Sequence, residues 1–263
     1  MRVLMQGRYG LLSAKGGDRV QIENTADCLR SMGVSVDIVD SDVSDISSYD
    51  IVHVFQLDWT PETHFFVKHA KAQGKKVILS PIHHNIAEVK KFDDICVYDY
   101  RRISKYLFRD QHSRDTFKNV YRSIFTPKKL WPTMYSVFAG LKNMHIETLK
   151  MCDAVLVQTD LEASDLISTY DVDIKWVKVP NGVGEQFLQL GRFDNPFDFS
   201  DYIFCGGRIE PRKNQLNLIQ AVANFRQENN LDTKLVLAGN PSTFNHLEYT
   251  YRFKKALVDN PWV

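Results

Sequence analysis

Two cations stand close together at the start of a helix that the sequence predicts over residues 213–229. An apolar strand at 202–205 runs into two glycines, Arg208 follows Gly207 directly, and Lys213 comes five residues after Arg208. Glycine lets the backbone come close to a ligand, and cations beside a helix N-terminus favour a doubly charged anion. We therefore predict that Gly207, Arg208 and Lys213 bind a diphosphate.

Two further segments carry residues suited to a ligand site. Gly16 and Gly17 stand before the first predicted helix, where backbone amides could face phosphate oxygens. His83 and His84 follow a predicted strand at 77–80, and the carboxyl ends of parallel strands are where open α/β sheets hold their ligands. A histidine can also transfer protons near neutral pH. We predict a binding role for the glycines and a catalytic role for His83, with a hydrogen-bonded loop histidine as the alternative.

The elements that would position these residues alternate between short apolar strands and helices. A helix over about 18–32 ends at Gly33, and Thr159 with Glu162 forms a capping box after a strand. Strands buried on both faces indicate a parallel sheet covered by helices. The pattern predicts a doubly wound α/β domain over residues 1–183, with strands at 3–5, 34–39, 51–55, 77–80, 154–158 and 174–179.

A second domain is predicted to begin after a break in this pattern. Residues 184–200 show no apolar period and are expected to be a linker. A strand, the helix at 213–229, a strand at 234–238 and a helix near 247–259 then follow. A unit of this size buries little core by itself, so we expect residues 201–263 to be the incomplete start of a second domain. The alternative is a small appendage packed on the first domain.

Composition narrows the class of protein. The 263 residues carry a formal net charge of +1, and the four cysteines are scattered without a C-x-x-C pair. This favours neither a metal site nor a disulfide framework. The start of the sequence shows no signal-peptide pattern, and no P-loop or G-x-G-x-x-G motif occurs. We expect a cytoplasmic protein that binds no metal and no nucleic acid.

Several segments in order resemble one protein family. They are Gly16-Gly17, Ile82-His83-His84-Asn85, residues 152–159, residues 179–183, Gly207-Arg208 with Lys213, and residues 235–239. Together they resemble the retaining glycosyltransferases of family 4, which have the GT-B fold. The resemblance spans nearly the whole chain.

The resemblance implies two Rossmann-like domains, of which the second is incomplete in this sequence. It implies transfer of a sugar from a UDP- or GDP-linked donor to a glycan or lipid-linked acceptor, with retention, in polysaccharide or glycolipid biosynthesis. Arg208 and Lys213 would then be catalytic, because they stabilise charge on the leaving diphosphate. The donor is a substrate, and no cofactor is implied. The family's pair of glutamates in the second domain has no counterpart in this sequence.

Two alternatives to this function stay open. One is a non-catalytic module that binds a sugar nucleotide or a glycan, including a truncated remnant that serves as a partner subunit. The other is a sugar-nucleotide epimerase of the same fold, since one architecture hosts several activities.

The segment 101–131 is unusually basic. It has nine Lys or Arg against Asp110 and Asp115, with aromatic residues interleaved at helical spacing. A basic amphipathic helix of this kind can lie on an anionic membrane surface, so peripheral contact with the inner face of a membrane is one expectation. The alternative is a helical insertion, about residues 96–145, whose apolar stripe packs on the first domain.

Overall fold

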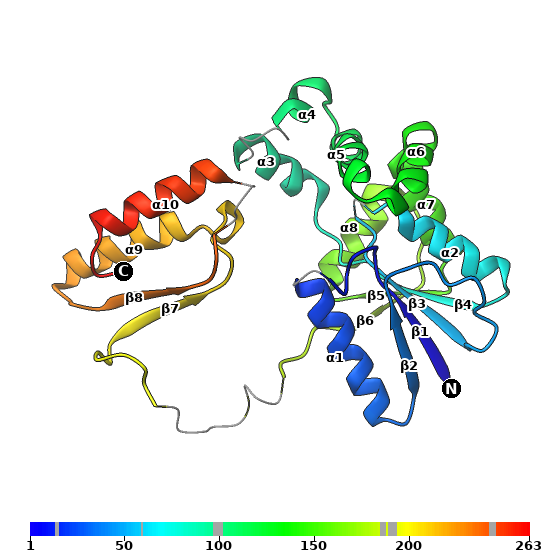
Figure 1. The fold of residues 1–263 in the computed structure, drawn as a ribbon, viewed down its shortest axis with the longest axis horizontal. Helices are drawn as coiled ribbons and strands as arrows, with labels where there is room; N and C mark the ends of the chain where they lie inside the picture. The colour runs from blue at the N-terminus through cyan, green and yellow to red at the C-terminus, as the bar shows by residue number, and fades with distance from the viewer. Residues whose placement is uncertain (14–15, 59, 97–101, 185–187, 189–193, 242–245) are drawn as a thin grey trace. The chain divides into compact units, whose positions relative to one another are not determined.

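The computed structural model describes residues 1–13, 16–58, 60–96, 102–184, 188, 194–241 and 246–263. Its contacts divide the chain into two compact units (Figure 1). The larger unit comprises residues 1–90 and 106–189, and the smaller comprises residues 91–105 and 190–263. The sequence predicts the domain boundary at a linker over residues 184–200, much of which lies outside the described residues. It also predicts that residues 91–105 belong to the first domain, whereas they group with the smaller unit.

A six-stranded parallel sheet forms the centre of the larger unit, as the sequence predicts for an α/β domain. Its strand order is β2-β1-β3-β4-β5-β6. The strands are β1 (Arg2–Gln6), β2 (Ser35–Val39), β3 (Ile51–Phe55), β4 (Lys76–Ser80), β5 (Ala154–Val157) and β6 (Trp176–Lys178). All six lie within two residues of their expected positions.

Helices cover both faces of this sheet. Successive side chains of a strand point to opposite faces, so Val3 and Met5 of β1 pack in one apolar cluster with Ile22 of helix α1 (Gly17–Ser31). Leu4 belongs to the other cluster, which α2 (Glu62–Ala72), α7 (Leu141–Met151) and α8 (Asp160–Tyr170) complete. The sheet is therefore buried on both sides, which accounts for its apolar strands.

The strand order changes direction between β1 and β3. The chain passes from β1 to β2 at one side and then to β3 at the other. Loops that follow strands diverge at such a point and leave room for a ligand outside the carboxyl ends of the strands. Gly16 begins α1 at this edge, as its N-cap residue, and Asp58 follows β3 there.

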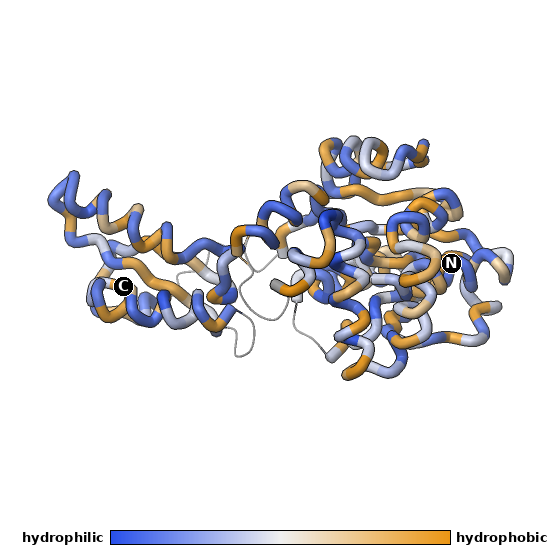
Figure 2. The backbone as a smooth tube through the Cα atoms, turned by 90° about the horizontal axis from the view of Figure 1, so that it is seen from above, coloured by the Kyte–Doolittle hydropathy of each residue, from blue (hydrophilic) through white to orange (hydrophobic). Residues whose placement is uncertain are grey.

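The smaller unit pairs two parallel strands, β7 (Tyr202–Gly206) and β8 (Lys234–Ala238). Helices α9 (Gln215–Asn229) and α10 (Leu247–Asp259) lie beside each other and pack on these strands (Figure 1). Both strands are coloured mainly as hydrophobic in Figure 2, whereas hydrophobic and hydrophilic residues alternate along the helices. The core contains Ile209, Ile219, Val222, Leu235 and Phe253.

Further helices lie between β4 and β5 in the sequence. They are α3 (Ile86–Cys96), α4 (Arg102–Leu107), α5 (Gln111–Phe125), the 3-10 turn η1 (Pro127–Lys129) and α6 (Leu130–Ala139). They occupy the region of the predicted insertion. None of the helices within the described ranges is long and apolar enough to cross a membrane.

Candidate functional site

The strand-to-turn junction after β7 is built on two glycines that touch. Gly207 has a φ of 149° and donates its N–H to the carbonyl of Ala238, 2.8 Å away. Gly239, with a φ of 159°, lies so close that a Cβ atom there would overlap the carbonyl oxygen of Gly207. L side chains rarely adopt such φ values, so both positions require glycine. The backbone after β7 is consequently uncovered by side chains of its own.

Lys213 and Arg208 stand beside this bare backbone. Lys213 ends the 3-10 turn η3 (Pro211–Lys213), and its Cε lies 3.7 Å from where a Cβ of Gly207 would be. Its stem thus passes over Gly207, while the residue stays exposed to solvent. The Arg208 side chain is 65% exposed, and its guanidinium lies 3.3 Å from the Glu210 carboxylate. Both cations therefore lie on the turn that follows β7, and their binding of a diphosphate stays a prediction.

A hydrogen-bond chain fixes the backbone of Arg208. Buried Gln215 donates from Nε2 to the Arg208 carbonyl at 2.8 Å, and the Tyr249 hydroxyl donates to Gln215 Oε1 at 3.0 Å. The same hydroxyl accepts the N–H of Leu216 at 3.2 Å. Helix α10 therefore positions the turn through α9. No sequence motif indicates this link between Tyr249 and Gln215.

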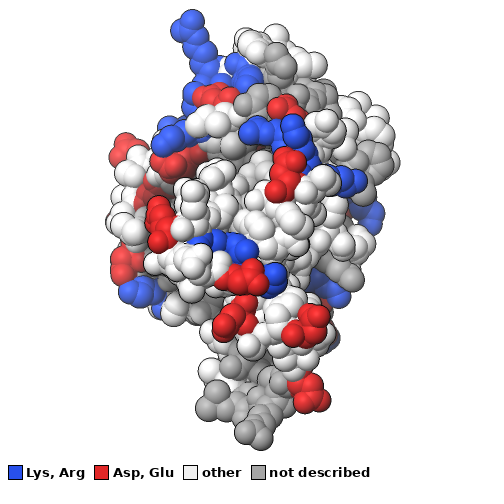
Figure 3. Space-filling view, turned by 90° about the vertical axis from the view of Figure 1, so that its left-hand side faces the viewer, with Lys and Arg blue, Asp and Glu red and all other residues white. Residues whose placement is uncertain are grey.

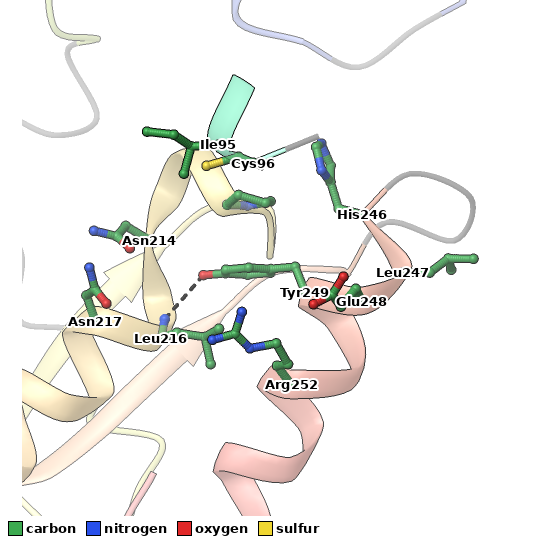
Figure 4. A pocket seen from close by; sticks show the side chains of 11 residues that line it. Ile95, Cys96, Asn214, Leu216, Asn217, His246, Leu247, Glu248, Tyr249 and Arg252 are labelled. Carbon is green, nitrogen blue, oxygen red and sulfur yellow. Dashed lines mark hydrogen bonds between the residues drawn. The ribbon is translucent and has the colours of Figure 1, made fainter. Parts of the chain in front are cut away.

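A cavity of about 400 Å³ opens next to this turn within the smaller unit (Figure 4). The ring of Tyr249 lies across it, and Asn214 and Asn217 from the start of α9 lie on one side. Glu248 and Arg252 come from α10. A flat ring surrounded by amides and charges suits a polar, partly planar ligand.

In the larger unit, His83 is held between two carboxylates. Its Nδ1 lies 2.6 Å from Asp58 Oδ1 and its Nε2 lies 2.9 Å from Asp165 Oδ2, and the side chain is only 1% exposed. Burial disfavours the imidazolium, but Asp58 and Asp165 outweigh burial and raise the pKa of His83. Burial likewise opposes ionisation of Asp58, yet bonds with His83 and His84 lower its pKa to about 2.

The surrounding loop is tied to α8 as well. Glu162 accepts the N–H of His83 at 2.8 Å and that of Gln158 at 2.6 Å. Asn85 donates to Asp165 at 2.6 Å. Thr159 accepts the N–H of Glu162, as the capping box predicts. The Glu162 carboxylate does not return to Thr159 but joins the residues that follow β4 and β5.

The catalytic role of His83 stays a prediction, and it requires that one ring nitrogen becomes available to a substrate. Both ring nitrogens already face carboxylates, so proton transfer to a substrate would need one of these bonds to open. The exposed imidazole of the pair is His84, whose side chain is 52% exposed. Sequence reasoning missed Asp58 and Asp165. The position of Asp58 just after β3 is the one signal that could have indicated it.

Gly16 and Gly17 lie at the start of α1, as predicted. Gly16 is extended, with a φ of −162°, and a Cβ there would touch the carboxylate of Asp18. Asp18 in turn lies 2.8 Å from Arg8. A carboxylate thus already supplies negative charge at this helix N-terminus, and an incoming phosphate would meet it. The phosphate-binding role of the two glycines stays a prediction.

The charges around these sites are mixed in sign. On the face of the molecule drawn in Figure 3, Lys and Arg are interspersed with Asp and Glu. That face has no broad basic field of the kind that nucleic-acid backbones select. Among the described residues, no group of His, Cys, Asp and Glu is arranged to hold a metal ion.

No family model matches the sequence, and the search of curated proteins finds no match.

Proposed function

We propose that this protein is a glycosyltransferase of the GT-B type that takes a sugar from a nucleotide-diphosphate donor and transfers it to a glycan or lipid-linked acceptor. The six-stranded unit would be the acceptor-side Rossmann-like domain, and the smaller unit would begin the donor-binding domain. The observation that carries the proposal is the turn after β7, where exposed Arg208 follows Gly207 and the exposed Lys213 side chain lies against it.

Three features of this turn suit a diphosphate. Gly207 has no side chain of its own, so phosphate oxygens could approach its backbone beside the Lys213 stem. Lys213 makes no ion pair with another described residue, so its ammonium is available for an anion. The N-cap residue of α9, Asn214, makes no side-chain cap bond, and although the N–H of Leu216 is bonded to Tyr249, the N–H groups of Gln215 and Asn217 at this helix start favour negative charge.

The same groups account for rate enhancement. Breaking the bond between the sugar and the phosphate develops negative charge on the leaving diphosphate. Fixed cations at Arg208 and Lys213 would stabilise that charge more in the transition state than in the bound donor. The chain Tyr249–Gln215–Arg208 would keep the turn from moving during the reaction.

The reaction is tested by incubating the protein with UDP- and GDP-linked sugars, with and without lipid-linked and oligosaccharide acceptors. We expect release of UDP or GDP that depends on an acceptor, with the anomeric configuration of the sugar retained. A change of the free donor into its epimer would instead support an epimerase. Tight donor binding without either reaction would support a binding module. No binding of any nucleotide sugar would overturn the proposal.

A matched set of variants connects the reaction to the turn. Lys213→Ala removes the cation that covers Gly207, and Arg212→Ala removes an exposed neighbouring cation that lies 3.7 Å from Glu210. We expect Lys213→Ala to lower the rate at least ~10-fold, as the loss of a charged contact to the transition state does. Arg212→Ala should change it less than ~3-fold, because a single exposed charge contributes little.

A further inference from the structure

The outer side of α5 and α6 exposes an apolar surface, here called the α5–α6 face. On α5, Tyr121, Ile124 and Phe125 are 40, 70 and 72% exposed, and on α6, Trp131, Met134 and Phe138 are 70, 41 and 84% exposed. Each set recurs at helical spacing, so each occupies one side of its helix. Soluble monomers rarely expose contiguous apolar surface of this kind unless it binds something.

The buried positions of α5 are polar, and those of α6 are polar apart from Pro132. Gln111, Arg114, Asn119 and Ser123 of α5 are at most 4% exposed, and Thr133 and Ser136 of α6 are each 1% exposed. The expected alternative, in which the apolar stripe packs on the domain and the cations face water, therefore does not describe α5. Its amphipathic pattern points outward, so the apolar residues of this face do not serve the core.

Lys and Arg predominate in the sequence that forms the α5–α6 face. Between residues 116 and 146 the sequence has five Lys or Arg and no Asp or Glu. Lys118 and Lys129 pair with Asp115 and Glu62, whereas Lys128 and Lys142 are exposed. A protein partner recognised by an apolar face need not be acidic, but the exposed cations Lys128 and Lys142 beside this face favour a negatively charged one.

We propose that the α5–α6 face docks on the surface of an anionic lipid bilayer. Its aliphatic and phenylalanine side chains would enter the boundary between headgroups and acyl chains, and Trp131 and Tyr121 have the amphipathic rings that favour this depth. Lys128 and Lys142 would lie near lipid phosphates. This inference does not rest on the proposed transferase activity, and its test requires no turnover.

The test is flotation of the intact protein with two kinds of vesicle, one of phosphatidylcholine alone and one of phosphatidylcholine with an equal part of phosphatidylglycerol. We expect the protein to float with the anionic vesicles at low salt. Lys128→Gln/Lys142→Gln should weaken binding by roughly 25-fold, about fivefold for each cation near the surface. Trp131→Ser/Phe138→Ser should weaken it at least ~10-fold, because both side chains would leave the lipid.

The matched control is Val20→Ser/Leu161→Ser, which removes two exposed apolar side chains elsewhere on the larger unit, 55 and 82% exposed. It should bind anionic vesicles as the unchanged protein does. Equal binding to both vesicle types, absence of binding, or an equal loss in the control would overturn the proposal. Dissociation of an oligomer by Trp131→Ser/Phe138→Ser would also overturn it, since the face would then be covered by a second copy.

Discussion

Gly207 and Gly239 set the tightest steric constraint at the proposed diphosphate site. Gly239→Ala would place a Cβ against the Gly207 carbonyl at a φ that L residues rarely adopt. We expect the free energy of unfolding of the smaller unit to fall by about 2–5 kcal/mol, from overlap and backbone strain together. Chemical denaturation followed by circular dichroism measures this change.

Gly182→Ala is the matched control for this substitution. A Cβ at Gly182 would meet nothing within 4 Å, and its φ lies outside the left-handed region. The free energy of unfolding should then change by less than about 1 kcal/mol. Equal effects of the two substitutions would contradict the close packing of Gly207 on Gly239.

The two carboxylates that hold His83 make the stability of the protein depend on pH. The raised pKa of His83 means that the folded state keeps a proton that the unfolded chain releases near its ordinary value of about 6.5. This stabilising contribution is complete below that pH and is lost as the pH rises through the folded pKa. Between about pH 6.5 and pH 8, the free energy of unfolding should therefore fall more steeply for the unchanged protein than for His83→Gln.

Urea denaturation at several pH values measures the difference. Other buried histidines do not obscure it, because burial lowers the pKa of His53 and His145 to about 3 and affects stability only below their unfolded pKa. Parallel curves for the unchanged protein and His83→Gln over this window would show that the two carboxylates do not hold a proton on His83.

At the scale of elements, a buried ion pair joins the inserted helices to the sheet domain. Lys129 of η1 lies 3.1 Å from Glu62 of α2, and the Glu62 side chain is fully buried. Lys129→Ala would leave a buried carboxylate without this cation, which costs about 3–5 kcal/mol. The neighbouring exposed cation provides the control, and Lys128→Ala should change the free energy of unfolding by less than about 0.5 kcal/mol.

Thermal or urea denaturation of the two variants decides the point. A large loss of unfolding free energy in Lys128→Ala, or no loss in Lys129→Ala, would contradict a structural role for Lys129 alone. This difference between the two lysines also matters for lipid docking, since Lys129 would then be structural while Lys128 is available at the surface.

The positions of helices and strands could be predicted well from the sequence. Which side of a helix is buried could be predicted less well. Strands β3 and β8 and helix α10 have the expected bounds. Buried strands and helices have apolar residues at a regular spacing, and this spacing stops where the element ends. The direction of the apolar side of α5 could not be predicted. Periodicity reveals that a helix has two faces, but it does not reveal which face the rest of the chain covers.

The candidate sites divide in a similar way. Gly207, Arg208 and Lys213 are neighbours in the sequence, so their proximity could be predicted. Asp58 and Asp165 reach His83 across 25 and 82 residues, and only the strand order brings them together. The Glu162 bridge between the residues that follow β4 and β5 depends on the same long-range packing.

At the scale of the whole molecule, the two compact units carry different candidate sites. The six-stranded unit carries the His83 loop at its carboxyl edge and the α5–α6 face, and the smaller unit carries the Gly207 turn and its cavity. The two-domain GT-B interpretation rests on the smaller unit acting as the donor side. The donor side requires that a nucleoside diphosphate binds at Gly207, Arg208 and Lys213.

The most direct test is calorimetric titration of UDP and of GDP into the unchanged protein, Arg208→Ala, Lys213→Ala and the control Arg212→Ala. We expect one of the nucleotides to bind the unchanged protein, with affinity at least ~10-fold lower in each of the first two variants, as for a lost charge-assisted hydrogen bond. Arg212→Ala should stay within ~3-fold. Binding of neither nucleotide, or equal affinity in all four proteins, would contradict the account.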